Sequence, residues 1–401
     1  MSREALVFRV ATAAATLHAL DDAFGHLGHG VGPGRHALAA AVSVAAAAAG
    51  VAGFGRLRPG LRAALALSFG MPAVANGVLH VRFMAAHGVS AAHVTGVLAL
   101  AAGVALIALA AAIPWRRRGQ GRARARVIAP IALAVGSFLV LGPLTLAVVD
   151  AHRFREPVGP PPDTSYRTVE FTAPDGVRLA GWYRPTRNGA TVVVLHGGGS
   201  DRTGSVAHAR MLARHGYGVL LYDARGSGES DGNQSSYGWG WDRDLAGALE
   251  FLERRPEVDA HRIGGLGLST GADVLLDVAA ERQDLRAVVT DGAAAGSFED
   301  WKRLRGVELG LPPGWVMFKA IEVLTGAHPA GRALADQVPR IAAPVLLVSA
   351  GAELEFGDLY ARLGSPRVEH WRLPHGHHTA TIRERPQEYE RRVVGFLDRA
   401  L

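Results

Sequence analysis

The first 150 residues consist mostly of apolar runs about as long as a lipid bilayer is thick, and this feature constrains the fold more than any other. A helix of about 20 apolar residues spans the hydrocarbon core of a membrane. Three runs reach that length without a charged residue in their interior, at residues 36–54, 91–115 and 127–149. Two weaker runs occupy residues 61–81 and 5–20. The sequence therefore predicts an all-α transmembrane bundle of about five spans.

The two weaker runs carry polar side chains that lower their hydropathy. Asn76 and His80 lie in residues 61–81, and Arg9 and His18 interrupt residues 5–20. The segment at residues 5–20 also has the length of a signal peptide, although no small-residue cleavage site follows it. The first span is thus the least certain part of the five-span prediction.

The distribution of arginines predicts how the protein is oriented in the membrane. The loop at residues 116–126 is rich in arginine, and such loops stay on the cytoplasmic side. Only the run at 127–149 separates this loop from the rest of the chain, so we expect everything after residue 150 to face outward. This predicts a multi-pass protein of the cell membrane. Residues 1–150 would form the membrane region, and residues 151–164, which include the proline-rich segment 157–162, would form a stiff linker.

Residues 165–401 read as an α/β domain. Two strand-like runs, 168–172 and 178–183, flank Pro174-Asp175-Gly176, which is a hairpin signal. Five further β-branched runs then alternate with helical stretches. The runs are 191–195, 218–222, 262–266, 287–290 and 345–349. This alternation predicts a mostly parallel sheet covered by helices on both faces.

Ser269 lies in a G-x-S-x-G pattern, Gly267-Leu268-Ser269-Thr270-Gly271. The chain has 50 glycines, so this match alone is weak. Its context strengthens it, because a buried strand precedes the serine and a helical stretch follows it. A serine in such a turn is held in a strained conformation at a helix N-terminus, as a nucleophile requires.

Upstream, His196-Gly197-Gly198-Gly199 ends another predicted strand. Successive glycines let backbone N–H groups turn toward a developing oxyanion. The N–H groups of Gly198 and Thr270 are the predicted oxyanion hole. The alternative is a plain glycine-rich turn.

A third motif follows the next strand, Asp223-Ala224-Arg225-Gly226-Ser227-Gly228-Glu229-Ser230. As a set, the three motifs resemble the α/β-hydrolase superfamily, in its serine-aminopeptidase-like and dienelactone-hydrolase-like esterase branch, over about residues 165–401. The resemblance implies the α/β-hydrolase fold. It also implies that Asp223 and Arg225 shape their loop and are not catalytic.

The same resemblance implies the base and the acid of a triad. Its histidine run corresponds to His375-Gly376-His377-His378, which makes His378 the expected general base and His377 the alternative. The acid position after the penultimate strand falls on Glu353. Glutamate replaces the usual aspartate there, and either carboxylate can accept from an imidazole. The other candidate acids are Glu355, Asp358 and Asp291, of which Asp291 has the simpler interpretation of a turn or helix cap.

The segment at residues 292–343 is too long for a simple connection and is expected to form a small helical cap over the site.

Histidines in the membrane half raise a separate question. His18, Asp22 and His26 are spaced for one helix face, and with His29, His80 and His93 they could bind a metal. The alternative, which we favour from sequence, is that they sit at hydrated helix ends, so no metal ligand is predicted.

Composition excludes several classes of function. The chain has no cysteine, which rules out disulfides and thiolate chemistry. Its net charge of +7 comes from arginines that do not alternate with aromatic residues, so nucleic acid is not an expected partner. We expect no cofactor.

The sequence predicts a membrane-anchored serine hydrolase for small or lipid-like carboxylic esters, with a Ser269–Glu353–His378 triad. A peptidase, an acyltransferase and a non-catalytic sensor of the same fold are the alternatives.

Overall fold

The computed structural model describes residues 2–24, 34–89, 93–116, 146, 155, 157–233, 237–305, 311–325, 327–329 and 332–401. These residues form two compact units. The first contains the described residues up to 116 together with one later helix, and the second contains the remainder from residue 155 on. The division between the units falls within the predicted linker.

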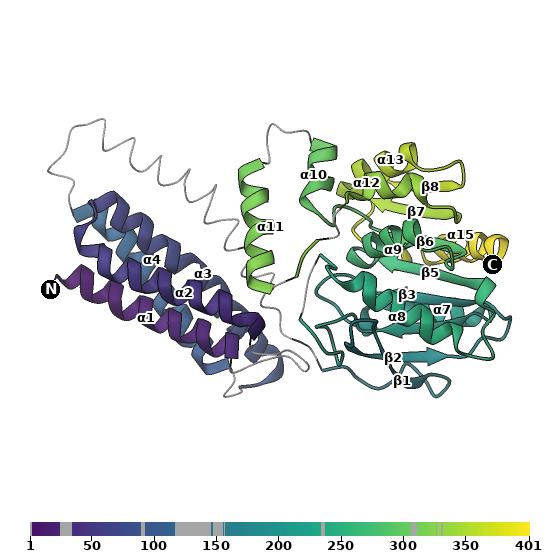
Figure 1. The fold of residues 1–401 in the computed structure, drawn as a ribbon, viewed down its shortest axis with the longest axis horizontal. Coiled ribbons are helices and arrows are strands. Elements are labelled where there is room, and N and C mark those ends of the chain that lie inside the picture. The colour runs from purple at the N-terminus through teal and green to yellow at the C-terminus, as the bar shows by residue number, and fades with distance from the viewer. Residues whose placement is uncertain are drawn as a thin grey trace. The chain divides into compact units, whose positions relative to one another are not determined.

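The first unit is helical (Figure 1). Its helices are α1 (Arg3–Phe24), α2 (Gly34–Gly53), the short η1 (Phe54–Arg56), α3 (Pro59–His87), α4 (Val94–Arg116) and α11 (Leu311–Thr325). Helix α3 packs along α4, and α1 contacts both α2 and α4. Glycines allow the close approach of α3 and α4, because a Cβ on Gly77 would lie 2.6 Å from the backbone nitrogen of Leu100.

Two helices in the described part of the chain are long and apolar enough to cross a membrane, by length and composition alone. They are Pro59–Ala86 and Val94–Ile113, with mean hydropathies of 1.4 and 2.6. Two further predicted spans correspond to α1, which carries charged residues, and to α2. The predicted span at 127–149 lies outside the described residues, apart from Leu146. A bundle of five spans is therefore not confirmed.

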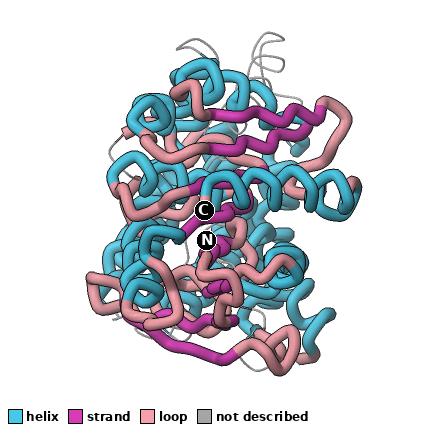
Figure 2. Tube along the Cα trace, turned by 90° about the vertical axis from the view of Figure 1, so that its right-hand side faces the viewer, coloured by secondary structure: helices cyan, strands magenta, loops and turns pink. Residues whose placement is uncertain are grey.

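The second unit is built on an eight-stranded sheet in the order β1-β2-β4-β3-β5-β6-β7-β8 (Figure 2). The strands are β1 (Arg167–Thr172), β2 (Arg178–Arg184), β3 (Thr191–Leu195), β4 (Gly218–Tyr222), β5 (Ile263–Leu268), β6 (Ala287–Asp291), β7 (Val345–Ala350) and β8 (Val368–Leu373). β2 pairs antiparallel with β1 and β4, and the other neighbours are parallel. The hairpin predicted around Gly176, whose φ is +87°, joins β1 to β2. The mostly parallel sheet is confirmed.

Helices cover both faces of this sheet. They are α7 (Val206–Arg214), α8 (Trp241–Glu253), α9 (Thr270–Glu281), α10 (Phe298–Arg305), α12 (Leu334–Gln337), α13 (Leu354–Leu363), α14 (Thr381–Glu384) and α15 (Pro386–Ala400). In β3, Val193 and Leu195 pack toward α8 and α9, while Val192 and Val194 pack toward α7 and α15. This period of two buries both faces of the central strands. Helices α10 and α11 fall in the predicted cap region, but α11 belongs to the first unit, so the cap stays a prediction.

Candidate active site

Ser269 lies in a sharp turn between β5 and α9. Its φ of +51° and ψ of −121° are rarely adopted by a residue with a side chain. The turn is held in place because the Ser269 N–H donates to the backbone oxygen of Asp291, at 2.8 Å. Gly271 is required here, since a Cβ would lie 2.6 Å from the backbone oxygen of His196. The turn presents the serine hydroxyl at the carboxyl edge of the parallel strands.

His378 and Glu353 come to the same edge from two other strands. Glu353 follows β7 and is buried, and His378 lies in the loop after β8. The Nε2 atom of His378 is 2.9 Å from Oγ of Ser269, and its Nδ1 atom contacts Oε1 of Glu353. The hydrogen bond with Glu353 raises the pKa of His378 above its ordinary value of 6.5. In this arrangement the serine hydroxyl can give its proton to the imidazole, and the carboxylate stabilises the imidazolium that forms.

The alternative residues lie elsewhere. His377 is 83% exposed and pairs with Glu384 at 2.5 Å, so its ring does not take part in the contacts of Ser269. Glu355 is exposed on α13, and Asp358 pairs with Arg372 at 2.8 Å. Of the candidate bases and acids, the structure brings His378 and Glu353 to Ser269.

Asp291 is the exception, because it is buried close to the same histidine. It ends β6. A Cβ on the next residue, Gly292, would lie 2.9 Å from Cε1 of His378. Burial raises the pKa of Asp291 to about 7, with the Tyr389 hydroxyl opposing this shift. The contact of the His378 Nδ1 atom is nevertheless with Glu353, which makes Glu353 the partner of the imidazole.

The predicted oxyanion hole is formed by segments that flank the serine. Thr270 is the first residue of α9, at the positive end of the helix. Gly197 lies beside the nucleophile, because a Cβ on it would be 3.2 Å from Cβ of Ser269. The position of Thr270 suits the predicted role, and the oxyanion hole of Gly198 and Thr270 stays a prediction.

His196 fixes the glycine-rich loop, a role that the sequence analysis missed. Its Nε2 atom accepts from the N–H of Ala224 at 3.0 Å, so its Nδ1–H donates to the backbone oxygen of Gly197 at 2.8 Å. Burial lowers the pKa of His196, consistent with a neutral ring. The position of His196 directly before three glycines was the available signal.

Asp223 and Arg225 organise the loop after β4. Asp223 is fully buried, pairs with Arg202 at 2.6 Å, and accepts from the N–H of Glu229 at 2.9 Å. Arg225 bridges Asp244 and Asp175, at 2.7 and 2.8 Å. These contacts are internal to the scaffold, so neither residue reaches Ser269.

Removing the Asp223 carboxylate is expected to destabilise the domain strongly, because Arg202 would remain buried without its one fully buried counterion among the described residues. Breaking a buried pair in this way costs about 3–5 kcal/mol, or roughly 6–20 °C in the unfolding midpoint of a domain of this size. Thermal unfolding of Asp223→Ala, followed by tryptophan fluorescence, measures the change. Glu229→Ala is the matched control, since Glu229 also pairs with Arg202 but is exposed and should matter by less than about 1 kcal/mol. Equal midpoints for the two variants would contradict the buried-pair explanation.

A cavity of about 200 Å³ lies beside α9. It borders the nucleophile turn, since its wall includes Gly238, where a Cβ would lie 2.8 Å from Cγ2 of Thr270. Three aspartates in its wall have raised pKa values because they are buried, Asp273 to about 8 and Asp277 and Asp300 to about 6. Asp273 is four residues after Ser269, so helical spacing could have identified it from sequence.

Comparisons with known proteins agree with this architecture. Residues 186–311 match the family model described as serine aminopeptidase, S33. The esterase Pf2001 of Pyrococcus furiosus is 28% identical, with a TM-score of 0.51, over 62% of this chain and 98% of the esterase. The chain contains an α/β-hydrolase domain.

Two curated bacterial proteins are similar to the α/β-hydrolase domain. The uncharacterized protein Rv2307c of Mycobacterium tuberculosis is 32% identical over 49% of this chain, and YfhR of Escherichia coli is 33% identical over 34% of it. The chain spans 66% and 50% of the length of these two relatives. The comparisons thus show the fold of the domain, and its chemistry must be argued from its own residues.

Proposed function

We propose that the protein is a membrane-anchored serine hydrolase that cleaves carboxylic esters through an acyl-enzyme on Ser269. One observation carries the proposal. The Ser269 hydroxyl lies 2.9 Å from the Nε2 atom of a histidine whose Nδ1 atom contacts a buried glutamate. A sensor or binding module has no need of all three groups in this line.

In the proposed reaction, Nε2 of His378 takes the hydroxyl proton as Oγ of Ser269 bonds to the acyl carbon. The N–H groups of Gly198 and Thr270 stabilise the negative oxygen of the tetrahedral intermediate. Glu353 holds the Nδ1–H tautomer and stabilises the imidazolium. The imidazolium then protonates the leaving alcohol as the C–O bond breaks. Water attacks the acyl-enzyme, gives its proton to His378, and releases the carboxylic acid as Ser269 regains its proton.

Membrane anchoring is supported by two apolar helices in the described residues, Pro59–Ala86 and Val94–Ile113. The arginine-rich loop at 116–126 supports an extracytoplasmic hydrolase domain. A domain held at a bilayer meets hydrophobic esters at high local concentration, so we propose lipid-like esters as its substrate class.

The test is hydrolysis of p-nitrophenyl esters by the purified full-length protein in detergent, with Ser269→Ala as the control. We expect turnover that the variant lacks, and a kcat/KM that increases from acetate to octanoate. No preference for longer acyl groups would contradict the lipid-like substrate class. No ester turnover by folded wild type would contradict the ester-hydrolase proposal itself.

A second candidate, an aminopeptidase of the same mechanism, is favoured by the carboxyl groups in the wall of the cavity beside α9. Asp277 and Asp300, when ionised, would stabilise the ammonium group of a peptide N-terminus. Amino-acid p-nitroanilides with and without an N-acetyl group distinguish this candidate. Cleavage that requires the free amine would favour the peptidase over the esterase.

A further inference from the structure

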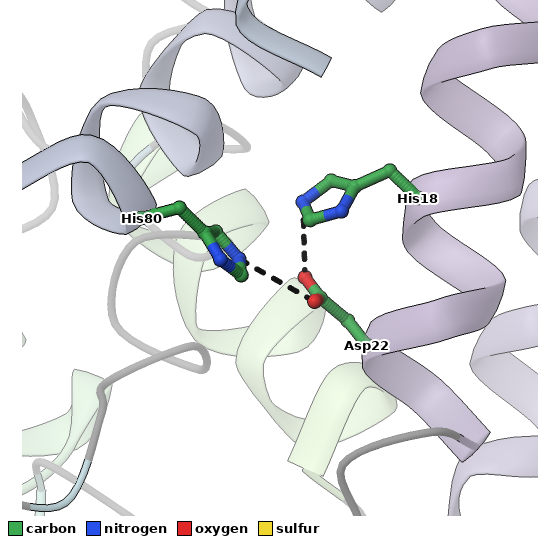
Figure 3. A group of neighbouring side chains, drawn as sticks. All are labelled: His18, Asp22 and His80. Atoms are coloured by element: carbon green, nitrogen blue, oxygen red, sulfur yellow. Dashed lines mark ion pairs between the residues drawn. The ribbon is translucent and has the colours of Figure 1, made fainter. Parts of the chain in front are cut away.

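A cluster of buried polar side chains lies within the helices of the first unit, apart from the hydrolase site. His18 and Asp22 come from successive turns of α1, and His80 comes from α3 (Figure 3). Their side chains are only 3%, 7% and 1% exposed. This burial does not fit hydrated helix ends, the interpretation that sequence favoured.

The potential ligand atoms already have the spacing of a metal site. The Nε2 atoms of His18 and His80 lie 3.3 and 3.4 Å from the two different oxygens of Asp22. Each of the three residues offers one potential ligand atom, and these atoms lie within 4.8 Å of one another. Ligands about 2.0–2.1 Å from a tetrahedral zinc ion are roughly 3.4 Å apart, so little movement is needed.

The hydrogen bonds of His18 indicate that Nε2 is the ring nitrogen that would bind a metal. The Thr95 hydroxyl donates to Oδ2 of Asp21 at 2.6 Å, so its oxygen accepts from Nδ1–H of His18 at 3.0 Å. The Nε2 lone pair then faces the Asp22 carboxylate. A metal-binding histidine is typically oriented in this way, by donating its other N–H to an outer acceptor.

Asn76 supplies a candidate fourth ligand. Its amide nitrogen is 2.7 Å from Oδ2 of Asp22 and 3.1 Å from Nε2 of His18. Its amide oxygen is buried and has no hydrogen-bond partner among the described residues. Rotating the Asn76 amide by half a turn exchanges the positions of its nitrogen and oxygen. The oxygen then faces Asp22 and His18, where the proposed ion would lie.

Charge and packing favour a divalent ion at this point. Asp21 and Asp22 carry two negative charges when ionised, and a divalent cation between neutral imidazoles balances them in an apolar helix bundle. The packing of α4 against α3 also leaves room for the His80 ring. Gly96 of α4 faces its ring, and a Cβ on Gly96 would overlap the imidazole. The outer nitrogen of that ring, Nδ1, is 3.1 Å from Nδ1 of His93.

We propose that His18, Asp22 and His80 bind one divalent transition-metal ion of the Zn²⁺ type, with the Asn76 amide oxygen or water as the fourth ligand. Two nitrogen ligands and one carboxylate suit zinc, and they suit tetrahedral Co²⁺ as a spectroscopic substitute. The site lies in the helical unit and takes no part in the ester chemistry proposed for Ser269.

The test uses full-length, tag-free protein in detergent, stripped with a chelator and titrated with Zn²⁺ and with Co²⁺. We expect about one zinc per chain by elemental analysis, and the visible absorption of tetrahedral Co²⁺. Asp22→Asn and His80→Gln should lose both signals, and Thr95→Val should weaken binding about 10–100-fold by releasing the His18 ring. His261→Gln, at an exposed histidine of the hydrolase domain, should bind as wild type does.

Labelling of Ser269 by a fluorophosphonate and a single gel-filtration peak report folding independently of the metal. Wild type that is folded by these criteria but binds no ion would overturn the proposal. Stoichiometric binding retained by Asp22→Asn or by His80→Gln would also overturn it, because the ion would then be held elsewhere. Thr95→Val keeps all three ligands, so it tests the site even where a ligand variant fails to fold.

Discussion

His378→Ala is expected to lower kcat/KM for aryl esters by a factor of about 10⁴ to 10⁶. Without the imidazole, the Ser269 hydroxyl has no base within 2.9 Å to accept its proton. Residual turnover would come from the oxyanion hole and substrate binding alone. Initial rates on p-nitrophenyl butyrate, measured with purified protein in detergent, give the ratio.

His377→Ala is the matched control for this prediction. It removes the adjacent histidine, which is exposed and pairs with Glu384. We expect its kcat/KM to stay within about twofold of wild type, since surface groups away from a site change little. A large loss in His377→Ala with little loss in His378→Ala would reverse the assignment of the base.

Glu353→Gln is expected to lower kcat/KM by about 10⁴, since an amide no longer holds the imidazole in the productive tautomer. The pH profile should change as well. The base acts when neutral, so activity falls as pH decreases through the pKa of His378, which Glu353 raises above 6.5. The acid limb of wild type should therefore lie above pH 6.5, and that of Glu353→Gln should lie lower. Profiles of kcat/KM between pH 5 and 9 measure both limbs.

Two other carboxyl variants show whether Glu353 is the acid. Glu355→Gln changes an exposed side chain on α13 and should leave the rate and the profile unchanged. Asp291→Asn removes a carboxyl with a pKa of about 7 that raises the pKa of His378 only through space. It should therefore move the acid limb slightly downward while retaining most activity. A loss in Asp291→Asn that exceeds that in Glu353→Gln would make Asp291 the acid.

Much of the candidate site could be predicted because its residues lie where strands end. Ser269 directly follows β5, so its local pattern placed it at the carboxyl edge of the sheet. Glu353 and His378 lie in the segments after β7 and β8, and they were predicted from the family resemblance. Sequence could not choose between His377 and His378 on physical grounds, because adjacent loop residues differ only in which way the backbone directs them. The raised pKa of Asp291 was also out of reach, since it depends on the burial of this carboxyl in the folded protein.

The helical unit was predicted less well. The run at residues 5–20 was the weakest of the predicted spans, and α1, which contains it, carries Glu4, Arg9, Asp21 and Asp22. The contact among His18, Asp22 and His80 could not be derived from spacing either. The i, i+4 pair of His18 and Asp22 is visible in sequence, whereas their contact with His80 depends on how α1 and α3 pack.

The most direct test of the central claim, that Ser269 is an activated nucleophile, is labelling by a fluorophosphonate probe in membranes that contain the full-length protein. The account predicts that wild type is labelled within minutes and that Ser269→Ala is not labelled at all. Both proteins must be present in equal amounts and folded, as judged by gel filtration in detergent. Folded wild type without labelling, or equal labelling of the variant, would contradict the assignment of Ser269 as the nucleophile.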